Sequence, residues 1–316
     1  MEQQPQTLME AVRFFEDQDR TLATMVALRW PTGVHCPTCG RVDVRFIATR
    51  RMWECKEKHP RRQFSAKVGT IFEDSPLKLD KWFVAIWSVA NCKNGISSHE
   101  LGRAIGVTQK SAWFMLHRIR LAMQTGSFIK MSGEAEADET YVGGLGKNMH
   151  AKKRERFSHD HTTDKAVVMG LLERTSAKGA SRVKAMVIRE PNKRILGQAV
   201  RDNVEPGSRL LTDAHKGYRG LNAEYVHEVI NHSVEYVRGT IHTNGIENFW
   251  SLLKRGIKGT YVSVEPFHLQ RYVEEQVFRF NERKDNDGGR FMKVLGSVSG
   301  KRITYKALIT HAASAH

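Results

Sequence analysis

The sequence predicts an α/β protein in which helices precede and flank a mixed sheet, and three patterns support this prediction. Apolar residues recur at helical spacing in residues 1–30 and again in residues 77–123. Between residues 134 and 213 the pattern changes to short apolar runs of strand length. A helical stretch at residues 195–204 precedes the last of these runs, and residues 244–283 are helical again. This order of elements indicates one mixed sheet packed against helices.

The composition indicates a strongly basic protein with a buried core. The chain has 316 residues, which is enough for one large domain or for two to three smaller ones. Apolar residues make up 40% of it, which excludes a wholly disordered chain. The chain carries 50 Lys and Arg residues against 34 Asp and Glu residues, a formal net charge of +16. Because such a charge attracts phosphate polyanions, we expect a nucleic-acid partner.

Membrane and secretory signals are not found in the sequence. No stretch approaches the roughly 18 uncharged apolar residues of a membrane span. The first residues, MEQQPQTLMEAVRFFEDQDR, are acidic and lack the apolar segment of a signal peptide. Four cysteines in a chain of this length do not make a disulfide scaffold. We therefore expect a cytoplasmic, nucleoid-associated protein with no membrane partner.

Breaks in the patterns divide the chain into five expected segments. Trp30-Pro31-Thr32-Gly33 ends the first helical stretch, because a residue before proline disfavours helix and glycine favours a turn. Residues 34–75 contain three of the four cysteines and few helical signals. The expected segments are N-terminal helices at 1–30, a small zinc-ribbon-like module at 31–75, a helical helix-turn-helix region at 76–130, a mixed-sheet core at 131–290 and a C-terminal tail at 291–316.

Three cysteines and a histidine form a candidate zinc site. Cys36 and Cys39 make a CxxC knuckle, which lets two thiolates reach one ion from a tight turn. Cys55 follows after a basic, aromatic stretch, and His59 lies beside the place where a strict ribbon would close with a second CxxC. These four residues predict a structural Cys₃His zinc site. The alternatives are His35 as the fourth ligand, and three free thiols without a metal.

Residues 96–123, ISSHELGRAIGVTQKSAWFMLHRIRLAM, have the layout of a helix-turn-helix. Ser97 or Ser98 can cap the first helix, Gly106 suits the turn, and Thr108 can cap the second helix. Apolar residues follow a helical stripe in both halves. The alternative is an ordinary helical pair with a charged face.

The second helix of this region carries the candidate DNA contacts. Gln109 and Lys110 lie at its N-terminal end, where a recognition helix meets base edges. Arg118 and Arg120 lie further along and are candidate phosphate contacts.

A basic segment between the first two strands is a further candidate DNA contact. Residues 143–165 are rich in glycine, lysine and histidine and have no apolar period, so we expect an exposed loop. Lys152, Lys153 and Arg154 give this loop a dense positive charge that can meet phosphates. The alternative is a solvated surface segment.

Three carboxylates occupy positions at which a metal site can be built. Asp138 lies within the first strand, where aspartate has low propensity, and Asp213 ends the fourth apolar run. Glu247 opens a helix whose buried stripe includes Trp250, and Lys254 follows two turns later on the same face. Two strand aspartates and a helical glutamate can converge at the edge of a mixed sheet, where their hard oxygens suit two Mg²⁺ ions for phosphodiester chemistry. Taken singly, such residues more often form turns or complement a helix dipole.

Together these segments resemble those of insertion-sequence transposases of the DDE type. The resemblance is to the branch with an N-terminal zinc ribbon and a ribonuclease-H-like catalytic core, and it covers most of the chain. It rests on the stretches ALRWPTGVHCPTCG, RRQFSAKVGTIFEDSPLKLDKWFVAIW, EADETYVGG, LLTDAHKGY and HTNGIENFWSLLKRGIKGTYVSVEPFHLQRYVEEQVFRFNER.

The resemblance implies a role for each candidate of the site. It implies Asp138 and Asp213 as the first two metal-binding acids, Glu247 as the third, and Lys254 as the basic residue that follows. The implied cofactor is Mg²⁺ or Mn²⁺, with two ions in each site. In part of the family an asparagine replaces the third acid. The alternatives near the site are Asn244, Asn248, Glu136, Glu139 and Asp202.

The resemblance also implies the reaction and its partners. Water hydrolyses a phosphodiester at the end of the element, and the freed 3′-hydroxyl then attacks target DNA at the same site. The implied partner is double-stranded DNA, bound by a homo-oligomer. Two other functions stay open at this point: a DNA-binding regulator with a catalytically silent core, and a structure-specific nuclease.

Overall fold

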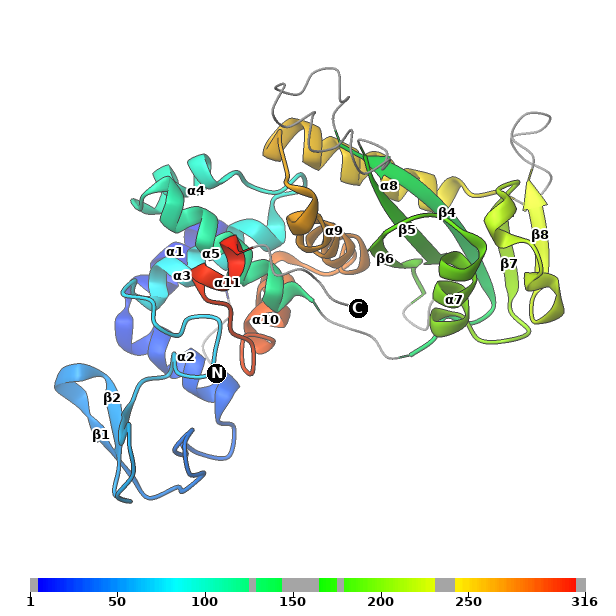
Figure 1. Cartoon of the computed structure of the whole chain (residues 1–316). Coiled ribbons are helices and arrows are strands. Elements are labelled where there is room, and N and C mark those ends of the chain that lie inside the picture. Colours follow the sequence, from blue (N-terminus) through cyan, green and yellow to red (C-terminus); the bar gives the residue numbers. More distant parts are fainter. Residues whose placement is uncertain (1–4, 125–128, 144–164, 175–178, 231–241, 311–316) are drawn as a thin grey trace. The chain divides into compact units, whose positions relative to one another are not determined.

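The computed structural model of the chain describes residues 5–124, 129–143, 165–174, 179–230 and 242–310 (Figure 1). The chain forms two compact units. The first comprises residues 1–125 and 284–316, and the second comprises residues 126–283. Among the described residues, no helix is long and apolar enough to cross a membrane.

The first unit begins with two helices and a small antiparallel sheet. Helices α1 (Leu8–Glu16) and α2 (Gln18–Arg29) are followed by strands in the order β1-β2-β3. The strands are β1 (Val44–Ile47), β2 (Met52–Cys55) and β3 (Gln63–Phe64). The rings of Trp30, Trp53 and Phe64 pack together with centroids 5.6 to 6.1 Å apart. This aromatic cluster supplies the core that so small a sheet otherwise lacks.

Helix α3 (Leu79–Asn91) is the buried centre of the first unit. The chain returns to it after the second unit, because α10 (Asp287–Gly296) packs on α3. The ring of Phe291 lies 5.9 Å from that of Phe83 and 5.5 Å from that of Trp87. The C-terminal segment also contains α11 (Tyr305–Ile309). The structure therefore differs from the expected tail at residues 291–316, since Phe291 and other described residues up to 310 are buried in the first unit.

Two helices occupy the segment for which a helix-turn-helix was expected. They are α4 (Ser98–Ile105) and α5 (Gln109–Met123). Ser97 caps α4 in a capping box with Glu100, which satisfies two backbone N–H groups. Gly106 ends α4 with a φ of 62°, a left-handed conformation that glycine adopts without steric cost.

The second unit contains the expected mixed sheet, with strand order β6-β5-β4-β7-β8. Strands β4, β5 and β6 are antiparallel neighbours, whereas β4, β7 and β8 run parallel. The strands are β4 (Glu134–Val142), β5 (Ala166–Glu173), β6 (Arg182–Ile188), β7 (Arg209–Asp213) and β8 (Val226–Ile230). This architecture is consistent with a ribonuclease-H-like core. The edge strand β8 was not expected from the sequence.

Helices cover both faces of this sheet (Figure 1). On one face, α7 (Lys193–Asn203) packs through Leu196 and Val200. On the other face, α8 (Asn244–Gly256) and α9 (Pro266–Asn281) form a second core with Val168 and Leu172 of β5. Successive residues of a strand point to opposite faces, so the even-numbered residues of β4 and β5 face α8.

Candidate active site

Asp138 and Asp213 lie at neighbouring positions on adjacent parallel strands. In the register of β4 and β7, Glu136 pairs with Leu211 and Ala137 pairs with Thr212. Asp138 and Asp213 are the next residues of the two strands. Their side chains therefore project from the same face of the sheet, the one covered by α8.

Helix α8 brings the other candidates to this face. The indole Nε1 of Trp250 donates a hydrogen bond to Oδ2 of Asp138 at 2.9 Å. Glu247 lies one turn before Trp250 and accepts a hydrogen bond from the Thr243 hydroxyl at 2.7 Å. Lys254 is half-buried two turns after Glu247 on the same helix. As the sequence predicted, Trp250 packs in the core, and it also orients a carboxylate.

Asp213 and Glu247 lie near enough to Asp138 for their charges to affect its pKa. The pKa of Asp138 is raised to about 6, chiefly by burial; the negative charges of Asp213 and Glu247 contribute to the rise, and the Trp250 hydrogen bond opposes it. Such mutual repulsion is relieved when a divalent cation binds between the carboxylates. Three carboxylates are the hard oxygen donors that Mg²⁺ or Mn²⁺ prefers, so this donor set fits the implied metal.

Gly170 makes room for the indole of Trp250 over the sheet. It pairs with Asp138 across β4 and β5. A Cβ at position 170 would lie 2.5 Å from Cη2 of Trp250 and 2.7 Å from Cδ1 of Ile246. Any side chain larger than hydrogen would therefore move α8 away from Asp138.

Glu136 forms a second connection between β4 and α8. Its Oε2 accepts the backbone N–H of Ile246 at 2.8 Å, and its Oε1 accepts Nε of Arg174 at 2.8 Å. The side chain is only 1% exposed. At position 245 a Cβ would lie 2.8 Å from Glu136 Oε2, so glycine allows this close approach. Through these bonds Glu136 connects β4 to the start of α8 and to Arg174.

Two other alternative acids lie away from this face. Glu139 projects toward the α7 side, where Tyr218 donates to one carboxylate oxygen and His215 Nδ1 lies 3.1 Å from the other. Burial raises the pKa of Glu139 to about 7, and the charges of Asp213 and Asp138 add to this rise while the Tyr218 hydrogen bond opposes it. Asp202 lies on α7 and accepts a hydrogen bond from Gln198 at 2.7 Å. Asn244 and Asn248 are both exposed in the first two turns of α8.

The candidate zinc ligands form a single cluster in the first unit. One ligand atom from each of Cys36, Cys39, Cys55 and His59 lies within 4.8 Å of the others. Cys36 Sγ is 3.4 Å from His59 Nε2, and Cys39 Sγ is 3.6 Å from Cys55 Sγ. Burial opposes ionisation of the Cys36 thiol, but backbone N–H groups of the knuckle lower its pKa to about 7. Three thiols and an imidazole at these separations fit tetrahedral Zn²⁺.

His35 is not part of this cluster. Its ring instead packs against Trp30, with centroids 5.9 Å apart. His59 therefore occupies the fourth position, although a lysine stands at position 58 where a second CxxC would place a cysteine.

The predicted DNA contacts of α5 differ in their exposure to solvent. Gln109 and Lys110 are exposed, with Gln109 Nε2 bonded to Ser98 Oγ at 2.8 Å and Lys110 Nζ 4.8 Å from the ring centre of Tyr305. Arg118 and Arg120 are only 4% and 1% exposed. Arg118 donates to the Ile303 carbonyl and lies over the ring of Phe114. The expectation that these two arginines meet phosphates is therefore corrected, because they are buried.

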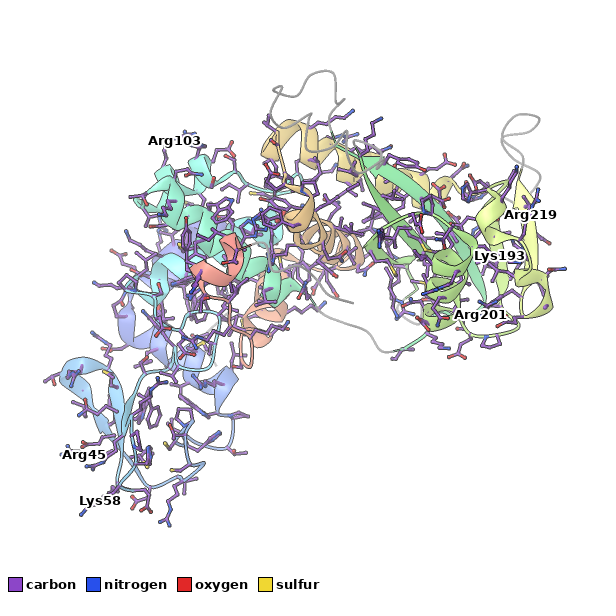
Figure 2. All side chains as sticks on the ribbon, viewed as in Figure 1. Arg45, Lys58, Arg103, Lys193, Arg201 and Arg219 are labelled. Carbon is purple, nitrogen blue, oxygen red and sulfur yellow. The ribbon has the colours of Figure 1, made fainter. Side chains whose placement is uncertain are left out.

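The predicted contacts of the basic loop, Lys152, Lys153 and Arg154, lie outside the described residues. Other basic side chains are exposed on each unit. Those labelled in Figure 2 are Arg45, Lys58 and Arg103 on the first unit, and Lys193, Arg201 and Arg219 on the second.

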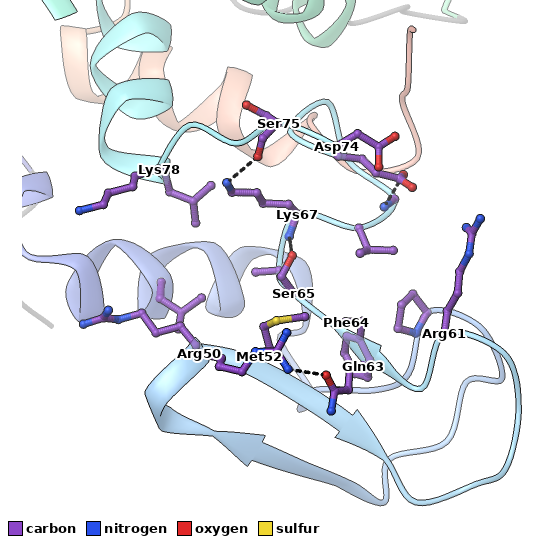
Figure 3. A pocket seen from close by; sticks show the side chains of 18 of the residues that line it. Arg50, Met52, Arg61, Gln63, Phe64, Ser65, Lys67, Asp74, Ser75 and Lys78 are labelled. Atoms are coloured by element: carbon purple, nitrogen blue, oxygen red, sulfur yellow. Dashed lines mark hydrogen bonds between the residues drawn. The ribbon is translucent and has the colours of Figure 1, made fainter. Parts of the chain in front are cut away.

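A basic pocket of about 1000 Å³ lies in the first unit between the small sheet and the start of α3 (Figure 3). Lys67 is held at its wall, where Nζ donates to the Ser75 carbonyl at 3.1 Å. Arg50 donates to Gln63 Oε1 at 2.8 Å. Arg61 and Lys78 also line the pocket and are exposed. The pocket therefore presents cations to solvent on the unit that carries the zinc cluster.

The fold and the site define an α/β protein with Asp138 and Asp213 side by side on one face of a mixed sheet and a separate Cys₃His module. Residues 130–281 match the family model of the ISXO2-like transposase domain, and residues 16–58 match that of the transposase zinc-ribbon domain. Over 260 residues the chain is 26% identical to an "Uncharacterized protein in transposable element ISH50" of Halobacterium salinarum. The aligned region covers 78% of this chain and 85% of that protein. Residues 130–281 are thus an ISXO2-like transposase domain and residues 16–58 a transposase zinc ribbon, and the chain is similar to an insertion-sequence protein over most of its length.

Proposed function

We propose that this transposase binds the ends of an insertion sequence, cleaves them in a metal-dependent reaction and transfers the 3′-hydroxyl end into target DNA. The observation that supports the proposal most is that Asp138 and Asp213 are neighbours on the sheet face covered by α8, the helix that carries Glu247. These acids come from two strands and a helix, and this arrangement supports the positions that the family resemblance implies.

Each residue of the site has a role in this proposal. Asp138, Asp213 and Glu247 would together hold the divalent ions through their carboxylate oxygens. Bound ions lower the pKa of the attacking oxygen and stabilise the leaving oxygen of an in-line displacement. Trp250 orients the Asp138 carboxylate through its N–H, and Lys254 holds a phosphate of the DNA end. Glu247 is the third ligand, with Asn244 as the alternative.

The first unit supplies end recognition in this account. Zn²⁺ held by the Cys₃His cluster stabilises the small sheet, because a sheet of this size has little core of its own. Gln109 and Lys110 are exposed at the start of α5 and contact base edges. The basic pocket beside the sheet adds phosphate contacts. We further propose a homo-oligomer on DNA and a cytoplasmic, nucleoid-associated location.

A strand-transfer assay tests the proposal. The substrate is duplex DNA with the terminal sequence taken from the DNA that flanks the gene, and a supercoiled plasmid serves as target. We expect Mg²⁺-dependent cleavage at the terminus followed by joined product. Binding without cleavage would instead support a regulator with a silent core, and cleavage without joining would support a nuclease.

A further inference from the structure

Val262 has a strained backbone conformation at a position exposed to solvent. It follows the π-helical segment Ile257–Tyr261, with φ of 61° and ψ of −55°. The backbone N–H of Ser263 donates to the Tyr261 carbonyl at 2.7 Å, which closes a γ-turn around Val262. A positive-φ γ-turn is rare and strained, and a β-branched residue is a poor choice for it. The side chain nevertheless stays 77% exposed.

The flanking residues hold this turn in place. The Tyr261 hydroxyl donates to Glu275, which forms a buried ion pair with Arg279. The ring of Tyr261 also packs edge-on against Tyr272, with centroids 4.7 Å apart. Strain of this kind persists only where the surroundings fix the chain, and it concentrates at functional positions. The anchored turn therefore presents a small apolar side chain outward at a fixed place.

Three cationic residues lie in the helical segment that precedes this turn. Lys254 and Arg255 lie in the last turn of α8, and Lys258 lies in the π-helical segment. Within the described part of the chain, none of these three side chains forms an ion pair. Uncompensated cations beside an exposed apolar residue fit a polyanion that also offers apolar faces, which is the chemistry of DNA.

We propose that the end of α8 and the γ-turn form a DNA-binding surface in which Val262 inserts as an apolar wedge between base pairs. Lys254, Arg255 and Lys258 hold the phosphates beside the insertion. This proposal rests on the proposed function, since it requires a DNA end at Glu247. From Glu247 to Val262 the helix rises roughly 20 Å, or about six base pairs of B-DNA. The unstacked step therefore lies about six base pairs from the cleaved phosphodiester.

Fluorescence of 2-aminopurine tests the wedge in the full-length protein. The probe is placed in turn at each of roughly the third to ninth base pairs from the terminus, and DNA is added without divalent metal. Unstacking raises 2-aminopurine fluorescence, so we expect a several-fold rise at one position near the sixth pair. Val262→Gly should abolish that rise, whereas Val262→Ile should retain it.

Two controls separate loss of the wedge from loss of the fold. Glycine adopts positive φ freely, so Val262→Gly should melt at a temperature no lower than the wild type. Val226→Ala, which removes another valine that is 58% exposed in the same unit, should retain the fluorescence rise. An unchanged rise in Val262→Gly, or no rise in a wild type that cleaves the terminus, would overturn the wedge alone. A wild type that neither binds nor cleaves the terminus would overturn the proposed function together with the wedge.

Discussion

Trp250 Nε1 and Asp138 Oδ2 are joined by a 2.9 Å hydrogen bond that connects α8 directly to the central strand of the sheet. Trp250 lies one turn after Glu247, so the same helix supplies one acid and orients another. The geometry of the site therefore depends on how closely α8 packs against β4.

Trp250→Phe should weaken metal binding while leaving the fold intact. Phenylalanine keeps an aromatic ring but removes the N–H that orients Asp138 and opposes the rise of its pKa. A hydrogen bond to a charged group contributes about 1.5–3 kcal/mol, so the Mg²⁺ concentration for half-maximal cleavage should rise about tenfold or more. Trp82→Phe is the control, because Trp82 Nε1 donates to Ser75 Oγ in the first unit. An equal effect of both variants would contradict the role given to Trp250.

Gly170→Ala should destabilise the second unit and impair the site. The added Cβ would overlap the indole of Trp250, and overpacking of this kind costs about 1–3 kcal/mol. Urea denaturation followed by tryptophan fluorescence measures the loss. Gly259→Ala is the matched control, since no atom lies within 4 Å of a Cβ at that position. Equal stability of the two variants would show that α8 accommodates the added carbon.

Glu136→Ala should destabilise more strongly, because it leaves Arg174 without its buried partner and the Ile246 N–H without an acceptor. Removing one member of a buried pair costs about 3–5 kcal/mol. Glu136→Gln keeps an acceptor oxygen and should cost less. Glu224→Ala breaks an exposed pair with Arg201 and should cost at most about 1 kcal/mol. Denaturation curves of the three variants that coincide would contradict this ranking.

Removal of zinc should unfold the small sheet of the first unit. Structural zinc contributes directly to folding, because the ligands converge on one site only in the folded chain. Treatment with a strong chelator should release one Zn²⁺ per chain and lower the melting temperature, and added Zn²⁺ should restore it. Cys39→Ser should reproduce the loss, whereas the exposed Cys92→Ser should not. A metal-free preparation with an unchanged melting temperature would overturn the zinc assignment.

Local pattern was enough to predict the main strands and the capped helices. Alternation and short apolar runs indicated β4 to β7, and Ser97, Gly106 and Thr108 fixed the ends of α4 and α5. The edge strand β8 was missed because it is short and exposes Val226 and Val229, so it lacks a clear buried face. The CxxC spacing with Cys55 and His59 indicated the metal cluster before its geometry was known.

Long-range packing was not predictable in the same way. A sequence shows Arg118 as a charge on a helix, and only the packed unit shows that it is buried with its guanidinium over Phe114. Most of helix α10 fell in the expected tail because the surface of α3 that it covers is nearly 200 residues away in the chain. The contacts of Glu136 and Gly170 with α8 depend on the pairing of the strands and on how closely the helix approaches the sheet. The spacing of residues in the sequence reveals neither.

The proposed reaction depends most directly on the three acids. Mg²⁺-dependent nicking of terminal DNA should be compared among the wild type, Asp138→Asn, Asp213→Asn, Glu247→Gln and the control Asp202→Asn, with DNA binding measured in parallel. We predict that the first three variants bind DNA but lose nicking by orders of magnitude, because each loses a metal ligand, while Asp202→Asn cuts like the wild type. Full nicking by any of the three, or equal loss in Asp202→Asn, would contradict the proposed metal site.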